Sequence, residues 1–138
     1  MILVINCRSI RNKIPEFQAL LTNSGAHVLI GTESWLKPEI DSSEVFDKNL
    51  IIYRKDRLNG NGGGVFIGVD KSLKSTEIEI DTDCEIACAE LTDKHKKSVI
   101  VNLFYRPPDS PIEVTEKFND IIGNLTQTYP KHTLLVTS

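Results

Sequence analysis

Short runs of mostly apolar residues are the feature that most constrains how this chain folds. They lie at residues 2–5, 28–31, 65–69, 99–104 and 134–136, and Asn102 is the one polar residue within them. Runs of this length that do not alternate with polar residues indicate strands buried on both faces. The chain is therefore expected to be a layered α/β protein in which most strands are covered from two sides.

The remaining pattern predicts two helices and several more strands. Apolar residues recur at helical spacing over residues 11–21, and Gly25 provides a stop signal. A second helix is expected to open at Ser110-Pro111-Ile112-Glu113, with Ser110 as N-cap and Glu113 as the capping-box glutamate. Further strands are expected at residues 50–54, 76–80 and 85–91. The glycine-rich segment 57–64 is predicted to be a hairpin turn, since a strand rather than a helix follows it.

Two helices are too few to cover so many buried strands. They would cover one face of a sheet and leave the other face open, which exceeds the few hundred Å² of apolar patch that a monomer usually exposes. A second layer is therefore expected to be missing from the chain. It would come from a continued chain, from a partner, or not at all.

Composition limits the function classes. The 138 residues fit one small domain. The net charge of −3 gives no global basic field of the kind that marks an electrostatic DNA binder. The three cysteines are expected to be buried and reduced, and the scattered histidines do not pair with them in a zinc pattern. Neither a signal peptide nor a membrane span is evident, which predicts an intracellular protein that is not secreted.

Polar side chains follow the ends of the apolar runs. Asn6 comes directly after the first run, Glu33 follows the second closely, and Tyr105 and Arg106 follow the run that ends at Phe104. If these strands are neighbours with matching ends, the four side chains meet at one rim, where they would suit a metal-bound phosphate. The same pattern would arise if each polar residue simply ended its strand at the surface. The residues alone leave both interpretations open.

Seven motifs in order resemble the endonuclease domain of non-LTR retrotransposons. That domain belongs to the endonuclease/exonuclease/phosphatase superfamily, together with apurinic/apyrimidinic endonucleases and deoxyribonuclease I. The motifs span nearly the whole chain, and CRSIRNK, TESWL and FYRPP are the most specific. They are MILVINCRSIRNK (1–13), GTESWL (31–36), YRKDR (53–57), GGGVFI (62–67), DCEIACAEL (83–91), FYRPPDSP (104–111) and HTLLVTS (132–138).

The resemblance implies a fold, a reaction and a set of roles. The fold would be a four-layer β-sandwich of the endonuclease/exonuclease/phosphatase type, with residues 1–138 forming its N-terminal half. Glu33 would bind a divalent metal, usually Mg²⁺. Asn6 would help to place the metal and the scissile phosphate. Tyr105 would contact that phosphate, and Arg106 is assigned only a contact with DNA. The reaction would be the nicking of DNA. The domain that carries it out would be part of a polyprotein that also contains a reverse transcriptase.

The resemblance also implies that catalytic residues follow the last motif. Family members continue with Gly-Asp-Phe-Asn and later a Ser-Asp-His motif, whereas the sequence here ends at Ser138. We therefore expect a domain truncated before Gly-Asp-Phe-Asn, with a weak or absent magnesium site and little or no activity. Trp35 is interpreted first as a loop anchor, with a DNA contact as the alternative.

Three other functions stay open from the sequence. The chain could be a decayed fragment without activity, an interaction module that uses an open sheet face, or a sugar or lipid phosphatase of the same superfamily. TESWL and FYRPP argue against the phosphatase. The reading frame beyond codon 138 discriminates between a domain piece and a decayed fragment.

Overall fold

The computed structural model describes residues 2–57, 62–82, 84–106 and 110–129, and the backbone of residues 133–137. Within these residues two α-helices and one 3-10 turn accompany strands that follow the predicted runs. The elements in chain order are β1 (Ile2–Asn6), α1 (Ile14–Ser24), β2 (Val28–Thr32), η1 (Ser42–Glu44), β3 (Leu50–Lys55), β4 (Val65–Asp70), β5 (Lys74–Glu77), β6 (Glu85–Thr92), β7 (Ser98–Tyr105), α2 (Ile112–Thr128) and β8 (Thr133–Thr137).

The strands form two four-stranded sheets. The first sheet has the order β1-β2-β4-β3, and the second has the order β5-β6-β7-β8. β1 runs parallel to β2, and β7 runs parallel to β8, while the other neighbours are antiparallel. The antiparallel pairing of β3 with β4 confirms the predicted hairpin, although residues 58–61 lie outside the described part of the chain.

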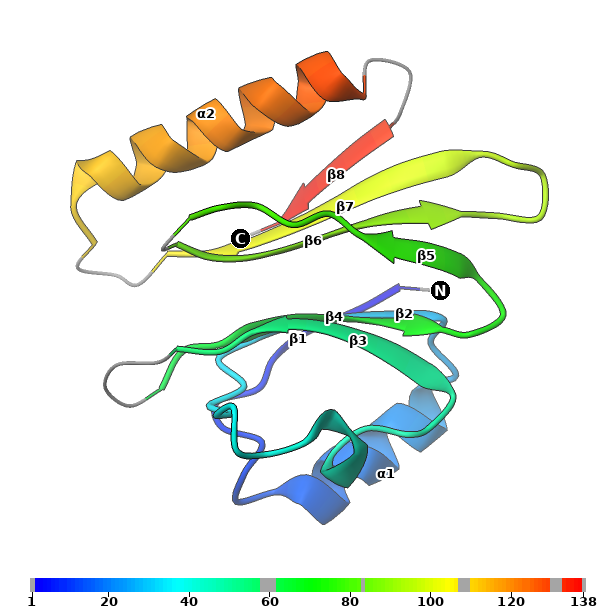
Figure 1. Cartoon of the computed structure of the whole chain (residues 1–138). Coiled ribbons are helices and arrows are strands. Elements are labelled where there is room, and N and C mark those ends of the chain that lie inside the picture. Colours follow the sequence, from blue (N-terminus) through cyan, green and yellow to red (C-terminus); the bar gives the residue numbers. More distant parts are fainter. Residues whose placement is uncertain (1, 58–61, 83, 107–109, 130–132, 138) are drawn as a thin grey trace.

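The two sheets pack face to face, with one helix outside each (Figure 1). Their inner faces share a buried core, which consists of Val28, Ile30, Val65, Ile67, Val69, Ala87, Ala89, Val101 and Leu103. α1 packs on the outer face of the first sheet, and α2 packs on the outer face of the second. The predicted four-layer sandwich is confirmed. The expectation of a missing second layer is wrong, because the chain itself supplies both sheets.

An aromatic cluster fixes α1 to the first sheet. Phe66 on β4 is fully buried, and its ring meets those of Phe17 on α1 and Phe46 at centroid distances of 6.3 and 4.9 Å. Gly31 on β2 pairs with Phe66, and a Cβ at Gly31 would overlap the Phe66 ring. A glycine is therefore required here, because the ring lies across the β2 backbone.

Three expected element boundaries change in the structure. α1 begins at Ile14 rather than Arg11, and it ends as predicted at Gly25, which is left-handed with φ 62°. α2 begins at Ile112 with Pro111 as N-cap and no side-chain cap, so the predicted capping box is wrong. β5 covers Lys74–Glu77, so residues 78–80 of the predicted strand lie outside it. No helix among the described residues is long and apolar enough to cross a membrane.

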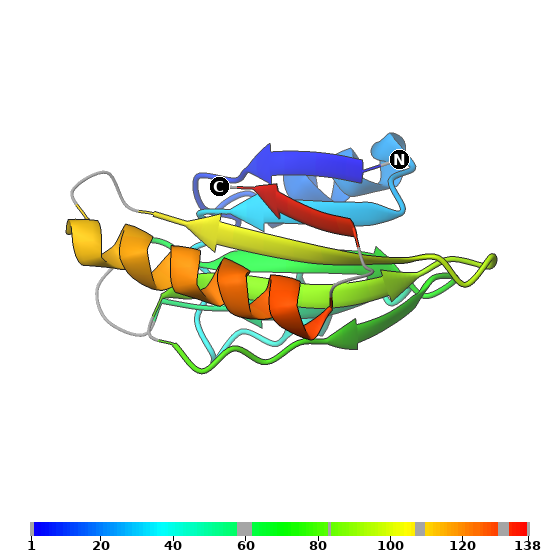
Figure 2. The ribbon, with the colours of Figure 1, turned by 90° about the horizontal axis from the view of Figure 1, so that it is seen from above.

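β1 forms one edge of the first sheet, on the same side of the molecule as β8 in the second (Figure 2). Its side chains alternate between intermediate and exposed, and Ile2 and Val4 are 48% and 61% exposed. The prediction that β1 is buried on both faces is therefore wrong. β1 is an edge strand and pairs with β2 alone. Its apolar residues therefore reflect this pairing and the packing of one face against α1.

The expectation of buried cysteines is confirmed for Cys84 and Cys88 but not for Cys7. Cys84 and Cys88 are buried, Cys7 is half-buried, and all three are free thiols. Burial raises the pKa of the Cys7 thiol to about 12 and that of Cys88 to about 11. Both thiols are thus protonated at neutral pH, which makes them poor nucleophiles and poor metal ligands.

Candidate active site

The ends of β1 and β2 lie side by side. Asn6 pairs with Thr32, and the two chains stay hydrogen-bonded beyond the strands. The amide of Cys7 donates to the Thr32 carbonyl, and the amide of Ser9 donates to the Glu33 carbonyl, both at 2.9 Å. Side chains alternate along a strand, so Asn6 shares the face of Ile2 and Val4, opposite to the face that packs against α1. Asn6 and Glu33 therefore lie at one rim.

Tyr105 reaches this rim from the second sheet. It is the last residue of β7, and the pleat places it on the inner face beside Val101 and Leu103. Its hydroxyl donates a hydrogen bond to Oε1 of Glu33 at 3.1 Å, across 72 positions of sequence. The strands that end in these polar residues are not all neighbours, since they form two parallel pairs in two sheets. The pairs nevertheless end at the same rim of the sandwich.

The surroundings of Tyr105, which include Glu33, shift the pKa of its hydroxyl. Burial raises the pKa of the Tyr105 hydroxyl above its ordinary value of 10, and the hydrogen bond to the Glu33 carboxylate raises that pKa further. The folded chain thus favours the neutral phenol. The shifted pKa of Tyr105 contributes to the free energy of unfolding. This contribution is fully present at pH values below the ordinary pKa of tyrosine, and it is lost as pH rises through the higher pKa of the folded state.

The loops at this rim adopt unusual backbone conformations. Glu33 and Trp35 have φ values of 52° and 60°, and Arg8 and Ser9 have φ values of 47° and 80°. Non-glycine residues in the left-handed region cost roughly 1–3 kcal/mol each and gather at functional sites. These four residues lie in the segments that directly follow β1 and β2, and the other left-handed non-glycine residue of the described chain, Lys96, lies in the β6–β7 turn. This concentration of strain supports a functional rim rather than a simple surface end of each strand.

The glycine-rich turn before β4 supports the Glu33 loop. The amides of Ser34 and Trp35 donate to the carbonyls of Gly64 and Gly63 at 3.3 and 2.9 Å. All three glycines at 62–64 are left-handed, and a Cβ at Gly64 would lie 2.5 Å from the Ser34 hydroxyl. The turn can approach the loop this closely only because glycine occupies these positions.

An ion pair between Arg57 and Glu85 ties the turn to the second sheet. Nη2 of Arg57 lies 2.7 Å from Oε2 of Glu85, and Oε1 of Glu85 accepts the amide of Gly64. We refer to this ion pair, together with the hydrogen bond from the Gly64 amide, as the Arg57–Glu85 clamp. The sequence carries no signal for this pair, because its members lie 28 positions apart.

Asn6 and Arg106 are less tightly placed than Glu33 and Tyr105. Asn6 is exposed and borders a cavity of about 170 Å³ between the end of β1 and α1. Arg106 is exposed, and its guanidinium donates to the Ser110 carbonyl at 3.4 Å. The structure therefore brings Glu33 and Tyr105 into contact, sets Asn6 beside them through the backbone, and turns Arg106 toward the loop before α2.

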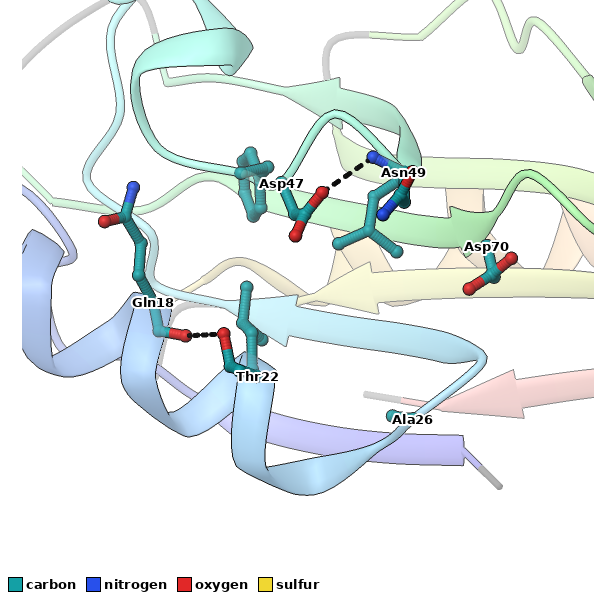
Figure 3. A pocket seen from close by; sticks show the side chains of 9 residues that line it. Gln18, Thr22, Ala26, Asp47, Asn49 and Asp70 are labelled. Atoms are coloured by element: carbon teal, nitrogen blue, oxygen red, sulfur yellow. Dashed lines mark hydrogen bonds between the residues drawn. The ribbon is translucent and has the colours of Figure 1, made fainter.

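A larger cavity, of about 360 Å³, lies at the opposite end of the first sheet (Figure 3). Asp47, which precedes β3, and Asp70, the last residue of β4, both border it. The Asp47 carboxylate accepts the amide of Asn49, and the Asp70 carboxylate accepts the amide of Ser72. These carboxylates cap turns, so this cavity does not compete with the rim as the catalytic site.

The side chains at the rim fit part of a magnesium site. Mg²⁺ is commonly held by one or two carboxylates together with water and substrate phosphate. Glu33 would supply one carboxylate and Asn6 an amide oxygen, while Glu85 is engaged in the Arg57–Glu85 clamp. Across the residues that the structure describes, no three or more His, Cys, Asp or Glu side chains are grouped to hold a metal.

Comparison with known proteins finds similarity in structure alone. Neither a family model nor a curated protein matches the sequence. The endonuclease domain of TRAS1, a telomere-specific non-LTR retrotransposon, matches with a TM-score of 0.74 at 15% identity, over 98% of this chain and 57% of that chain. The 3'-5' exonuclease NExo from Neisseria meningitidis matches with a TM-score of 0.70 at 17% identity, over 98% and 55%.

An AP endonuclease from Archaeoglobus fulgidus is also similar, with a TM-score of 0.64 at 14% identity, over 92% of this chain and 51% of that chain. The chain thus spans little more than half the length of these proteins. The identities are low, so the similarity concerns the fold. The chain has the layered fold of the endonuclease/exonuclease/phosphatase superfamily, over a length equal to about half of the TRAS1 endonuclease domain and its structural relatives.

Proposed function

We propose that this chain forms part of a metal-dependent phosphodiesterase that nicks DNA, as the endonuclease domain of a retrotransposon polyprotein. The observation that supports the proposal most is the bond from Tyr105 to Glu33, which joins two sheets at the rim where the strained loops gather. The names of the structural neighbours agree with this chemistry. They include a retrotransposon endonuclease, a Neisseria phosphatase bound to a product DNA hairpin, and a zebrafish protein complexed with single-strand DNA product.

Each side chain at the rim has a role in this proposal. The Glu33 carboxylate provides the hard, negative oxygen ligand that Mg²⁺ prefers. When bound, the metal supplies charge stabilisation of the phosphoryl oxygens and of the leaving oxygen. Tyr105 keeps its proton to high pH, so its hydroxyl can donate a hydrogen bond to a phosphate oxygen. The Asn6 amide can donate a second such bond, from the first sheet.

The described part of the chain provides no evident base for the attacking water. His27 precedes β2 and His95 lies in the β6–β7 turn, so both are at the end of the sandwich opposite to Glu33. His132 lies outside the described residues. The residues that activate water are therefore proposed to belong to a continuation of the polyprotein, with the reverse transcriptase further along.

The interaction-module alternative has less support than the nuclease. It required an open apolar sheet face, and the second sheet covers most of that face, although Ile2 and Val4 on β1 stay exposed. A sugar or lipid phosphatase of the superfamily would have the same fold. Only its activity on phosphate monoesters distinguishes it from a DNA-nicking enzyme.

We expect the 138-residue chain to show little or no nicking of supercoiled plasmid in the presence of Mg²⁺. Catalytic residues that act as a unit each cost several orders of magnitude when absent. The assay is gel separation of supercoiled from nicked plasmid, with a Glu33→Ala variant as the control for contaminating nuclease. Metal-dependent nicking by the wild-type chain that Glu33→Ala abolishes would contradict the expected inactivity.

The longer product of the same reading frame tests the activity itself. If the frame runs into Gly-Asp-Phe-Asn, that product is expected to nick plasmid DNA, and Glu33→Gln is expected to lower the rate by orders of magnitude. The alternative substrates are sugar and lipid phosphate monoesters. Release of phosphate from these compounds without plasmid nicking would overturn the proposal in favour of a phosphatase.

A further inference from the structure

Trp35 is an exposed aromatic side chain in the loop that carries Glu33. It is 38% exposed, whereas its neighbours Ser34 and Leu36 are 1% and 0% exposed. Its φ of 60° lies in the left-handed region, which a bulky residue adopts only at a cost in strain. A glycine at this position would avoid the strain. The structure therefore holds a large aromatic group at the surface against its backbone preference.

The loop and the glycine-rich turn fix the orientation of this side chain. The Trp35 amide donates to the Gly63 carbonyl at 2.9 Å. A Cβ at Gly62 would lie 3.3 Å from the indole Nε1 and 3.7 Å from Nη1 of Arg57. The nitrogen-bearing edge of the indole thus packs against the turn beside the Arg57–Glu85 clamp. Backbone and side chain are both restrained, which lowers the entropy lost when a ligand stacks on the ring.

The position of Trp35 relative to the rim suits one nucleotide. One residue, Ser34, lies between Glu33 and Trp35, which limits the distance between their Cα atoms to about 7 Å. Arg8 and Arg106, both exposed, follow β1 and β7 at the same end of the sandwich. A phosphate at Glu33 and Tyr105 would therefore bring the attached or adjacent base within reach of the indole, with guanidinium groups near the backbone.

We propose that Trp35 is a stacking platform for an unpaired nucleobase next to the phosphate at Glu33 and Tyr105. This inference rests on the proposed nucleic-acid function of the rim. Stacking on an aromatic ring tolerates any base, because every base has a π-face. The platform thus contributes affinity for single-stranded or locally opened DNA rather than recognition of a particular sequence.

Intrinsic fluorescence tests the inference directly, because Trp35 is the only tryptophan in the chain. The 138-residue chain is titrated with a single-stranded thymidine oligonucleotide in low salt with Mg²⁺. The control is an abasic oligonucleotide of the same length and charge, and fluorescently labelled versions report binding by anisotropy. We expect saturable quenching by the thymidine strand and little quenching by the abasic strand.

Two variants separate stacking from packing. Trp35→Leu keeps an apolar group against Gly62, and it is expected to weaken binding of the thymidine strand by roughly 5- to 150-fold with little effect on the abasic strand. Trp35→Phe keeps an aromatic face and is expected to retain most of the affinity. Circular dichroism and urea unfolding establish that both variants are folded. If Trp35→Leu does not fold, two measurements still test the stacking platform. They are the comparison of wild type with Trp35→Phe, and the comparison of fluorescence quenching by the thymidine and abasic strands.

The possible failures are distinguishable. Equal binding of both strands without base-dependent quenching would overturn the stacking platform and leave the DNA-binding rim intact. Equal loss of affinity for both strands in Trp35→Leu would mean that the indole only shapes the loop. If neither strand binds the wild-type chain, both this inference and the proposed function are contradicted.

Discussion

Phe66→Ala is expected to lower the free energy of unfolding by about 4 kcal/mol. Phe66 is fully buried and has ring contacts with Phe17 on α1 and with Phe46. Removing the ring deletes both contacts and leaves a cavity between β2 and α1, which Gly31 has no side chain to fill. Because domains of this size are stable by only about 5–15 kcal/mol, the loss is a large share of the total. Urea unfolding followed by circular dichroism measures it.

Two controls accompany this variant. Phe66→Leu keeps part of the buried volume and is expected to cost clearly less than Phe66→Ala. Ile112→Ala removes an apolar side chain that is 67% exposed at the start of α2, and it is expected to change stability by no more than about 0.5 kcal/mol. A loss below about 1 kcal/mol for Phe66→Ala would mean that α1 is not held by the aromatic cluster.

Gly63→Ala is expected to cost about 3 kcal/mol through two effects that act together. Gly63 is left-handed with φ 67°, so alanine there is strained. Its Cβ would also overlap the Arg57 guanidinium and lie 2.5 Å from Oε1 of Glu85. Relief of the overlap requires the Arg57–Glu85 clamp to open, which removes the charged partner of the Gly64 amide. Urea unfolding at neutral pH measures the loss.

Gly25→Ala is the matched control for that experiment. Gly25 is also left-handed, with φ 62°, but no atom lies within 4 Å of the position its Cβ would take. Alanine there carries the backbone strain alone, which is expected to cost about 1 kcal/mol. Equal losses for Gly63→Ala and Gly25→Ala would contradict the account in which the clamp fills the space beside Gly63.

The sequence predicted the strands well but not how they combine into sheets. Apolar runs mark strands because burial on either face demands apolar side chains. On β7, Val101 and Leu103 face the other sheet while Ile100 and Phe104 face α2, so the run reads as continuous. The pattern indicates that both faces of the strand are covered, but it does not indicate which element covers each face. For this reason the second layer was expected from outside the chain, although the chain itself contains the second sheet.

The rim was partly predictable for a similar reason. Asn6, Glu33 and Tyr105 each follow an apolar run, and strands that run in the same direction end at the same rim. The left-handed backbone of Glu33 and Trp35 could not be predicted, because neither residue type favours it. The Arg57–Glu85 clamp joins the end of a hairpin to the start of a strand in the other sheet. Such a pair follows only from knowing that the sheets face one another.

The contact between Glu33 and Tyr105 across the two sheets is the central claim, and a tyrosine titration tests it most directly. Tyrosinate absorbance is followed against pH in the wild-type chain and in Glu33→Gln, with Tyr105→Phe assigning which of the three tyrosines is observed. Glu44→Gln, on η1, controls for the loss of one carboxylate elsewhere.

We expect the pKa of Tyr105 to lie above 10 in the wild type, and to fall toward 10 in Glu33→Gln because the carboxylate that favours the neutral phenol is gone. Glu44→Gln should leave the pKa of Tyr105 unchanged. A pKa of Tyr105 that does not respond to Glu33→Gln would mean that the two side chains do not meet, and the proposed phosphodiesterase rim would lose its foundation.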